Sequence, residues 1–255
     1  MLSYWLNPAR LPLVIAHRGA SAYAPENTVS AFRLAMAQGA DGAELDVALS
    51  ADGAVVVIHD DTVDRTTNGT GRVAHLTLAA LRVLDAGQGE RIPTLAEVIE
   101  ATADATSPFL LNIELKAAWS SSAPALTRAV VEVVRATGSA ERVLFSSFSP
   151  FVVRSVAQLA PEVPRAWLYQ RAMPRWARAL GLRLAGDCHF EHPEHALVNA
   201  SLVQRCVRLG RRVNTWTVSD IGRAVQLARL GVHGLIGDDP LLLIEAREVA
   251  EQGAK

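Results

Sequence analysis

Apolar runs alternate with amphipathic segments along almost the whole chain, and this alternation restricts the fold more than any other feature. Several of the runs are nearly continuous, among them PLVIA, PFLLNI and RVLF. Near-continuous apolar strands are typical of a parallel sheet covered on both faces. We predict strands at 13–17, 43–50, 55–60, 109–116, 143–148, 165–169, 184–190, 213–218 and 234–237. We predict helices at 26–38, 94–103, 124–136, 151–159, 175–180, 201–209, 221–230 and 241–251.

Strands separated by helices pair in parallel through right-handed crossovers. Roughly eight such units in a chain of 255 residues favour a closed barrel over an open sheet. We therefore predict an α/β fold in which residues 1–255 form a single (β/α)8 TIM barrel domain. The longest irregular stretch, 61–91, is rich in Thr, Gly and Asp and predicts a small insertion after the second β/α region.

Composition excludes several partners. The formal net charge is −1, so no strong overall field exists to bind nucleic acid. The two cysteines, Cys188 and Cys206, make no disulfide framework and favour a reducing compartment. The first residues lack the pattern of a signal peptide, and no apolar run is long enough for stable membrane insertion. We expect a cytoplasmic protein of unassigned oligomeric state.

Polar and ionisable side chains stand at nearly every predicted strand end. In a barrel of this type, the carboxyl ends of the strands converge on one face, where the catalytic groups of such enzymes lie. We therefore expect these side chains to surround one site. They are His17, Arg18, Glu44, Asp46, His59, Glu114, Lys116, Trp216 and Asp238.

The carboxylates among them predict a metal site. Glu44 and Asp46 are two residues apart on one strand, so both face the same side, and Glu114 ends a nearby strand. Several carboxylates that point into the open carboxyl end of the barrel, which we call its mouth, repel one another unless a cation neutralises their charge. Oxygen ligands suit Mg²⁺ or Ca²⁺ better than zinc, so we expect one divalent cation of either kind.

Two histidines and two cations complete the candidate site. His17 and His59 each end a strand, and an imidazole can carry or release a proton near neutral pH, which suits general acid–base catalysis. Arg18 and Lys116 would supply fixed positive charge to a phosphoryl group. The alternative role of these two side chains is to pair with the neighbouring carboxylates.

In this order the residues resemble the glycerophosphodiester phosphodiesterase family. The resemblance rests on HRG with PENT at 17–28, on ELD at 44–46, on HDDT at 59–62 and on NIELK at 112–116. It continues through FSSFSP, VNTWTV and GVHGLIGDDP and so covers nearly the whole chain. It implies a TIM barrel that hydrolyses a small-molecule glycerophosphodiester to glycerol 3-phosphate and an alcohol.

The resemblance also implies residue roles. It makes Glu44, Asp46 and Glu114 the metal ligands and His17 and His59 the acid–base pair. It makes Arg18, Lys116 and Trp216 substrate-binding residues. Glu26, Asn27 and Asp61 would have supporting roles: Asn27 could orient His17 or a water, and Asp61 could support His59 or the water around the metal. The role of Asp238 stays open.

Similarity to the phosphatidylinositol-specific phospholipases C implies that the glycerol 2-hydroxyl attacks phosphorus and that water then opens a cyclic phosphate. We favour His17 as the base and His59 as the acid, with the roles exchanged in the second step. Two alternatives are a lysophospholipase D-type hydrolase and a non-catalytic barrel that binds phosphodiesters.

The chain departs from the family pattern at two places. Only residues 88–91 separate LDAG from the IPTL element, where relatives often carry a longer aromatic stretch, which bears on the alcohol side of the substrate. Gly237 stands where a threonine commonly precedes the aspartate; it would widen the mouth or serve a turn.

Two further segments have open interpretations. His189, His192 and His195 could form a second metal site, but we interpret them as part of a loop after the sixth strand. Arg171, Arg175, Arg178 and Arg183 surround Trp176 on and beside the predicted helix at 175–180. We interpret them as a solvated basic face, with a face that touches a membrane as the alternative.

Overall fold

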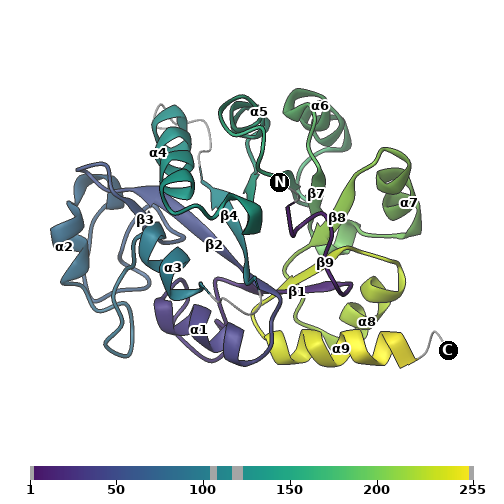
Figure 1. The fold of residues 1–255 in the computed structure, drawn as a ribbon, viewed down its shortest axis with the longest axis horizontal. Helices are drawn as coiled ribbons and strands as arrows, with labels where there is room; N and C mark the ends of the chain where they lie inside the picture. The colour runs from purple at the N-terminus through teal and green to yellow at the C-terminus, as the bar shows by residue number, and fades with distance from the viewer. Residues whose placement is uncertain (1–2, 104–107, 117–122, 253–255) are drawn as a thin grey trace.

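A computed structural model of the chain describes residues 3–103, 108–116 and 123–252. Within these residues, eight strands pair in parallel and close on themselves, since β1 pairs with both β2 and β9 (Figure 1). The barrel strands are β1 (Leu13–His17), β2 (Gly42–Leu49), β4 (Leu110–Leu115), β5 (Val143–Ser147), β6 (Arg165–Tyr169), β7 (Phe190–Pro193), β8 (Arg212–Thr215) and β9 (Gly234–Gly237). This confirms the predicted (β/α)8 TIM barrel.

Helices lie around the outside of the barrel. They are α1 (Val29–Ala37), α3 (Leu95–Ala101), α4 (Ala123–Ala136), α5 (Pro150–Leu159), α6 (Arg175–Ala185), α7 (Ala200–Arg208), α8 (Ile221–Arg229) and α9 (Pro240–Gln252). Helix α1 begins later than predicted because the side chain of Thr28 caps it by accepting a hydrogen bond from the Ala31 amide. In the described residues, no helix has the length and apolarity that crossing a bilayer would require.

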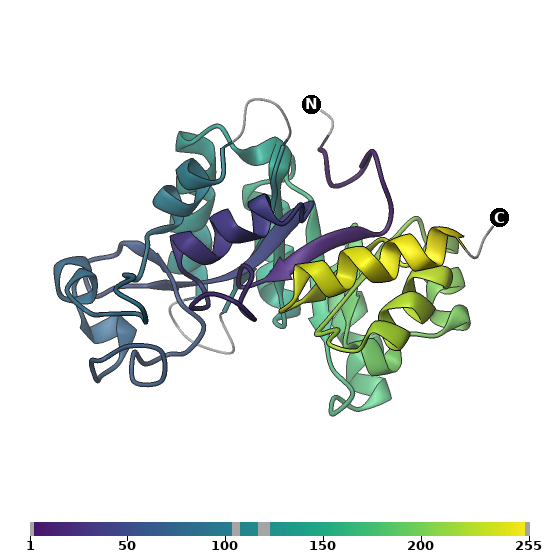
Figure 2. The same cartoon turned by 90° about the horizontal axis from the view of Figure 1, so that it is seen from below.

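The stretch that follows β2 has its own small structure. Strand β3 (Val55–Val57) pairs antiparallel with β2 and lies outside the barrel, so it is an extra strand. The chain then forms a short helix, α2 (Leu78–Arg82), and an apolar cluster that includes Ile58, Val63 and Leu81. This part projects from one end of the molecule in both views (Figures 1 and 2). It corresponds to the insertion predicted at 61–91.

Two predictions around β7 were wrong. The segment at 184–190 is not a strand, because α6 continues to Ala185 and the next strand begins at Phe190. Part of the histidine-rich tract is therefore a strand and not a loop. His192 is buried inside the barrel, where its Nε2 lies 3.1 Å from Nδ2 of Asn214. Burial lowers the pKa of His192 to about 3, which keeps the ring neutral.

Trp5 closes the amino-terminal end of the barrel. It is fully buried, and its ring meets Phe190 edge-on at 6.2 Å. Its carbonyl oxygen lies 2.9 Å from Nε2 of His233, and its indole N–H donates to the carbonyl of Arg142. Apolar side chains that include Leu13, Ile15 and Leu110 pack with Trp5 inside this end of the barrel. The polar side chains of the predicted site lie at the opposite end.

Candidate active site

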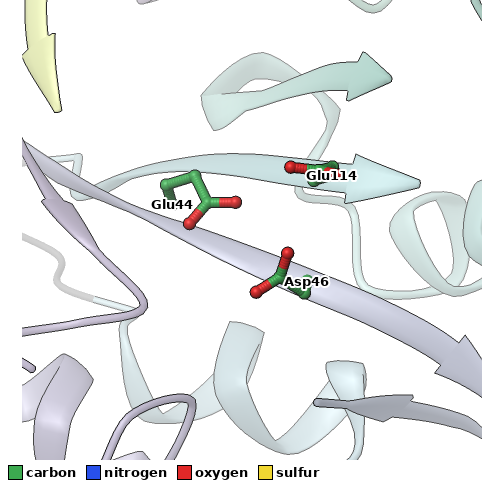
Figure 3. A group of neighbouring side chains, drawn as sticks. All are labelled: Glu44, Asp46 and Glu114. Atoms are coloured by element: carbon green, nitrogen blue, oxygen red, sulfur yellow. The ribbon is translucent and has the colours of Figure 1, made fainter. Parts of the chain in front are cut away.

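Three buried carboxylates form the centre of the site at the carboxyl end of the barrel. Glu44 and Asp46 lie on β2, and Glu114 lies on β4 beside Asp46 in the parallel register. The period of two along each strand turns all three into the barrel mouth (Figure 3). One oxygen from each carboxylate lies within 4.8 Å of the others. The predicted acidic cluster is therefore present.

The electrostatics of this cluster fit a hard divalent cation. Burial raises the pKa of Glu44 well above its ordinary value, and Asp46 and Glu114 add to the rise. Burial and the charge of Asp46 raise the pKa of Glu114 to about 8. The protein alone therefore holds protons on this cluster near neutral pH, whereas a cation would stabilise its ionised form. The donors are all oxygens, as Mg²⁺ and Ca²⁺ prefer.

Arg18 and Lys116 approach the same carboxylate from two sides. Nε of Arg18 lies 3.3 Å from one oxygen of Asp46, and Nζ of Lys116 lies 3.4 Å from the other. Both cations therefore pair with a carboxylate, which was the alternative role considered for them from the sequence. Both cations also remain partly exposed, so they can meet an anion that enters the mouth.

His17 ends β1 directly beside Glu44, its partner in the register between β1 and β2. Its Nδ1 lies 2.6 Å from Oδ1 of Asp238, which follows β9. Its Nε2 faces the acidic cluster, 3.8 Å from Oε2 of Glu44. The hydrogen bond from His17 lowers the pKa of Asp238. Asp238, whose role the sequence left open, therefore orients the ring.

His59 reaches the same mouth from the end of β3. The amide of Ile58 donates to the carbonyl of Asp46, which anchors this turn beside the cluster. Nδ1 of His59 lies 2.5 Å from Oδ1 of Asp60. Burial lowers the pKa of His59, although Asp46 and Asp60 oppose that effect.

The structure places Asp60, and not Asp61, against His59. Asp61 is exposed, and its carbonyl accepts from the amide of Val73. Asp60 also accepts from Nε of Arg65, whose hydrogen bond is the main reason that the pKa of Asp60 is lowered. The sequence HDDT does not show which of its two consecutive aspartates binds the histidine; in the structure it is the first, Asp60.

Two residues of the PENT segment, Glu26 and Asn27, make hydrogen bonds to Arg18 and Asp46 of the site. Nδ2 of Asn27 donates to Oδ2 of Asp46 at 3.1 Å, so Asn27 orients this carboxylate and not His17. Glu26 accepts from Arg18 at 2.9 Å and from both terminal nitrogens of Arg65. The hydrogen bonds from Arg65 are the main reason that the pKa of Glu26 falls to about 2. Arg65 is a residue that the sequence reasoning missed.

Trp216 follows β8 and stands at the same end of the barrel. Its indole N–H donates to the carbonyl of His192 at 2.8 Å, and Phe148 meets its ring edge-on at 5.4 Å. These contacts fix the plane of a half-buried aromatic ring. The ring is therefore a rigid wall that a substrate could contact.

The sequence was compared with known families and curated proteins. The model of the glycerophosphoryl diester phosphodiesterase family matches residues 17–242. The glycerophosphodiester phosphodiesterase of Caldanaerobacter subterraneus is 42% identical over 240 residues, which cover 91% of this chain and 96% of that protein. The chain belongs to the glycerophosphoryl diester phosphodiesterase family. The glycerophosphodiester phosphodiesterase of Bacillus altitudinis is 32% identical, and the alignment covers 92% of this chain and 98% of that protein.

Solved structures of glycerophosphodiester phosphodiesterases share the fold of this family member. An Oleispira antarctica phosphodiesterase in complex with the product sn-glycerol-3-phosphate superposes with a TM-score of 0.84 at 35% identity. The alignment covers 93% of this chain and 97% of that one. The Agrobacterium tumefaciens glycerophosphodiester phosphodiesterase gives a TM-score of 0.75 at 29% identity, with 93% and 100% covered.

Gly237, where this family member departs from the usual threonine, is required by packing. A Cβ atom there would lie 2.3 Å from the carbonyl oxygen of Val218. The chain that follows β8 therefore approaches β9 more closely than any side chain allows. Gly237 serves this close approach at the end of the strand that leads to Asp238.

Proposed function

We propose that this protein hydrolyses glycerophosphodiesters to glycerol 3-phosphate and an alcohol, with one Mg²⁺ or Ca²⁺ ion bound by Glu44, Asp46 and Glu114. The observation that carries the proposal is the three-carboxylate cluster, flanked by two imidazoles that each have a carboxylate on Nδ1. The names of the relatives agree with it, as does the product bound in the Oleispira antarctica structure.

The cation, when bound, supplies a Lewis acid that polarises a phosphoryl oxygen. The protein's own charges add to this effect. Arg18 and Lys116 flank Asp46 and would contact the other phosphoryl oxygens. Their fixed positive charge stabilises the negative charge that grows on these oxygens as the nucleophile attacks.

The two histidines move the protons. With Nδ1 bound to Asp238, His17 has Nε2 available to take the proton of the attacking glycerol 2-hydroxyl. His59, held by Asp60, protonates the leaving alkoxide. Burial lowers the pKa of His59 in the free protein, and a phosphodiester anion beside the ring raises it again. In the second step the roles exchange, and water opens the cyclic phosphate.

A turnover assay tests the reaction. Metal-free protein is given glycerophosphocholine, glycerophosphoethanolamine or a lysophospholipid, with Mg²⁺ or Ca²⁺ in turn. Release of glycerol 3-phosphate from the small diesters, and of lysophosphatidic acid from the lysophospholipid, is followed. We expect release from the small diesters only when a cation is present. Turnover of the lysophospholipid alone would assign the lysophospholipase D-type activity. If no product forms with any substrate and cation, the result would contradict the proposal and favour a non-catalytic barrel that binds phosphodiesters.

Histidine variants test the acid–base pair. His17→Ala and His59→Ala should each lower kcat by a factor of about 10²–10⁴, because each removes one proton-transfer group. His75→Ala is the matched control, since His75 is exposed and lies outside the site. Near-normal turnover in either site variant would reject the assigned pair.

A further inference from the structure

Helix α6 presents an apolar and basic face to solvent. Residues 170–186 contain four arginines and no acidic residue. Trp176 is 71% exposed and Leu180 is 47% exposed. Trp176 and Leu180 are four residues apart and adjoin on the helix surface, and adjoining exposed apolar side chains often mark an interaction site.

The packing of α6 fixes the direction of this face. Gly181 is buried against Trp167, so closely that a Cβ atom there would lie 2.1 Å from the indole ring. Ala185, one turn later, is also buried. At 3.6 residues per turn, Trp176 and Leu180 fall on the opposite side of the helix. Their exposure therefore follows from how α6 is anchored to β6.

An arginine-lined groove runs beside this face, between α6 and α7. Its volume is about 510 Å³, and its lining includes Arg175, Arg178 and Arg205. Arg205 is bound to the buried carboxylate of Glu191. Within the described residues, neither Arg175 nor Arg178 belongs to a salt bridge, but Nε of Arg178 is buried on the side of the helix that holds Gly181. The exposed guanidinium group of Arg175 is thus available to an anion from outside.

Charge is distributed unevenly over the molecule. Residues 165–212, which include α6 and α7, hold nine arginines and three acidic residues, although the whole chain has a net charge of −1. Helix α6 begins just after β6, so its first turn lies at the end of the barrel that carries the acidic cluster. The basic sector therefore borders the mouth of the barrel.

We propose that Arg175, Trp176, Leu180 and Arg183, which we name the α6 surface, dock the protein on an anionic phospholipid bilayer. Trp176 and Leu180 would lie at the boundary of headgroups and acyl chains, and the arginines would contact lipid phosphates. A second copy of the chain is a poorer occupant, because the arginines of two such surfaces would repel each other. The proposal does not depend on the reaction proposed above.

Vesicle binding by the full chain tests the α6 surface. We expect it to sediment with vesicles of phosphatidylcholine and phosphatidylglycerol at 3:1, much more weakly with phosphatidylcholine alone, and to be released by 0.5 M NaCl, by charge screening. Arg175→Gln with Arg183→Gln should weaken binding about 25-fold, since each basic residue contributes about fivefold. Trp176→Ala should weaken it about tenfold. Acyl chains carrying bromine should quench Trp176 fluorescence, and Trp176→Phe should remove that part of the quenching.

Matched variants separate docking from general charge or folding effects. Arg128→Gln with Arg229→Gln removes the same charge from α4 and α8, and Val83→Ala truncates another exposed apolar residue. Both should bind the anionic vesicles like the unmodified protein, and all variants should share one unfolding midpoint. Equal binding by the α6 variants and the controls would overturn the proposal. So would a lack of vesicle binding together with a dimer that Trp176→Ala dissociates.

Discussion

At the scale of single residues, each imidazole of the site is held by one carboxylate on its Nδ1. Asp238 holds His17 at 2.6 Å, and Asp60 holds His59 at 2.5 Å. A carboxylate on Nδ1 fixes the tautomer and leaves Nε2 to exchange a proton with the substrate. The proposed acid–base chemistry therefore depends on two aspartates as well as on the histidines.

The neighbouring pair Asp60 and Asp61 offers a direct test of this arrangement. Asp60→Asn should lower kcat by a factor of about 10²–10⁴, because an amide cannot stabilise the protonated ring of His59. Asp61→Asn is the control, since this side chain is exposed and, among the described residues, Asp60 is the one bound to His59; it should stay near the unmodified rate. The pH profile of kcat should shift only in the Asp60 variant. Equal losses in both variants would count against the assignment.

Asp238 has a neighbour of the same kind. Asp239 accepts from the hydroxyl of Tyr23 and from the amide of Leu242, so it serves the start of α9 and not His17. Which of two adjacent aspartates turns toward an imidazole depends on the backbone direction at the strand end. From the sequence, Asp61 was a candidate support for His59 and Asn27 for His17. The residues that bind the two rings are Asp60 and Asp238.

At the scale of elements, the strands were easier to predict than the loops between them. The alternation Glu44–Asp46 and the parallel pairing of β2 with β4 follow from the pattern of apolar residues. The boundary between α6 and β7 did not follow, because Leu182, Leu184, Cys188 and Phe190 keep the period of two of a strand although the first two belong to α6. Gly186, with a φ of +70°, ends α6 there.

The contact of Gly181 with Trp167 predicts how α6 is held on the barrel. Gly181→Ala should lower the free energy of unfolding by about 1–3 kcal/mol, since the added methyl group overlaps the buried indole ring. Gly222→Ala in α8 is the control, because its nearest neighbour would lie 3.4 Å from the new Cβ, an ordinary contact. Urea unfolding of both variants measures the difference. A loss no larger in Gly181→Ala than in Gly222→Ala would show that the helix is packed otherwise.

At the scale of the whole molecule, closure of the barrel brings together residues from both ends of the chain. His17 on β1 meets Asp238 after β9, 221 residues away, because β1 and β9 are neighbours. The barrel topology predicted from the sequence brings both residues to one end of the barrel, but it did not predict their hydrogen bond. The sequence could not predict Arg65, whose hydrogen bonds to Glu26 and Asp60 depend on the fold of the insertion. A long irregular segment gives no periodic signal from which such contacts follow.

We predict that the buried His233, at the amino-terminal end of the barrel, makes the stability of the protein fall in acid. Burial lowers the pKa of His233 to about 4, below the ordinary value of about 6.5. The unfolded chain therefore binds a proton that the folded protein does not, so the free energy of unfolding falls as the pH drops from about 6.5 to 4. His233→Gln should reduce this slope by about 1.4 kcal/mol per pH unit. Urea unfolding between pH 7 and 4.5 measures it.

His75→Gln provides the comparison for that titration, because His75 is exposed. Its slope should match that of the unmodified protein. Parallel pH dependence in the His233 variant and the unmodified protein would mean that the buried ring beside Trp5 does not resist protonation.

Calorimetric titration of metal-free protein with Mg²⁺ and with Ca²⁺ tests most directly whether Glu44, Asp46 and Glu114 hold one cation. We expect one ion per chain, an affinity that rises with pH toward 8 as the proton on Glu114 is lost, and a loss of at least about a hundredfold in Glu44→Gln. His17→Asn and His59→Asn should bind the ion almost as well as the unmodified protein. Unchanged binding in Glu44→Gln, or a stoichiometry other than one, would contradict the account.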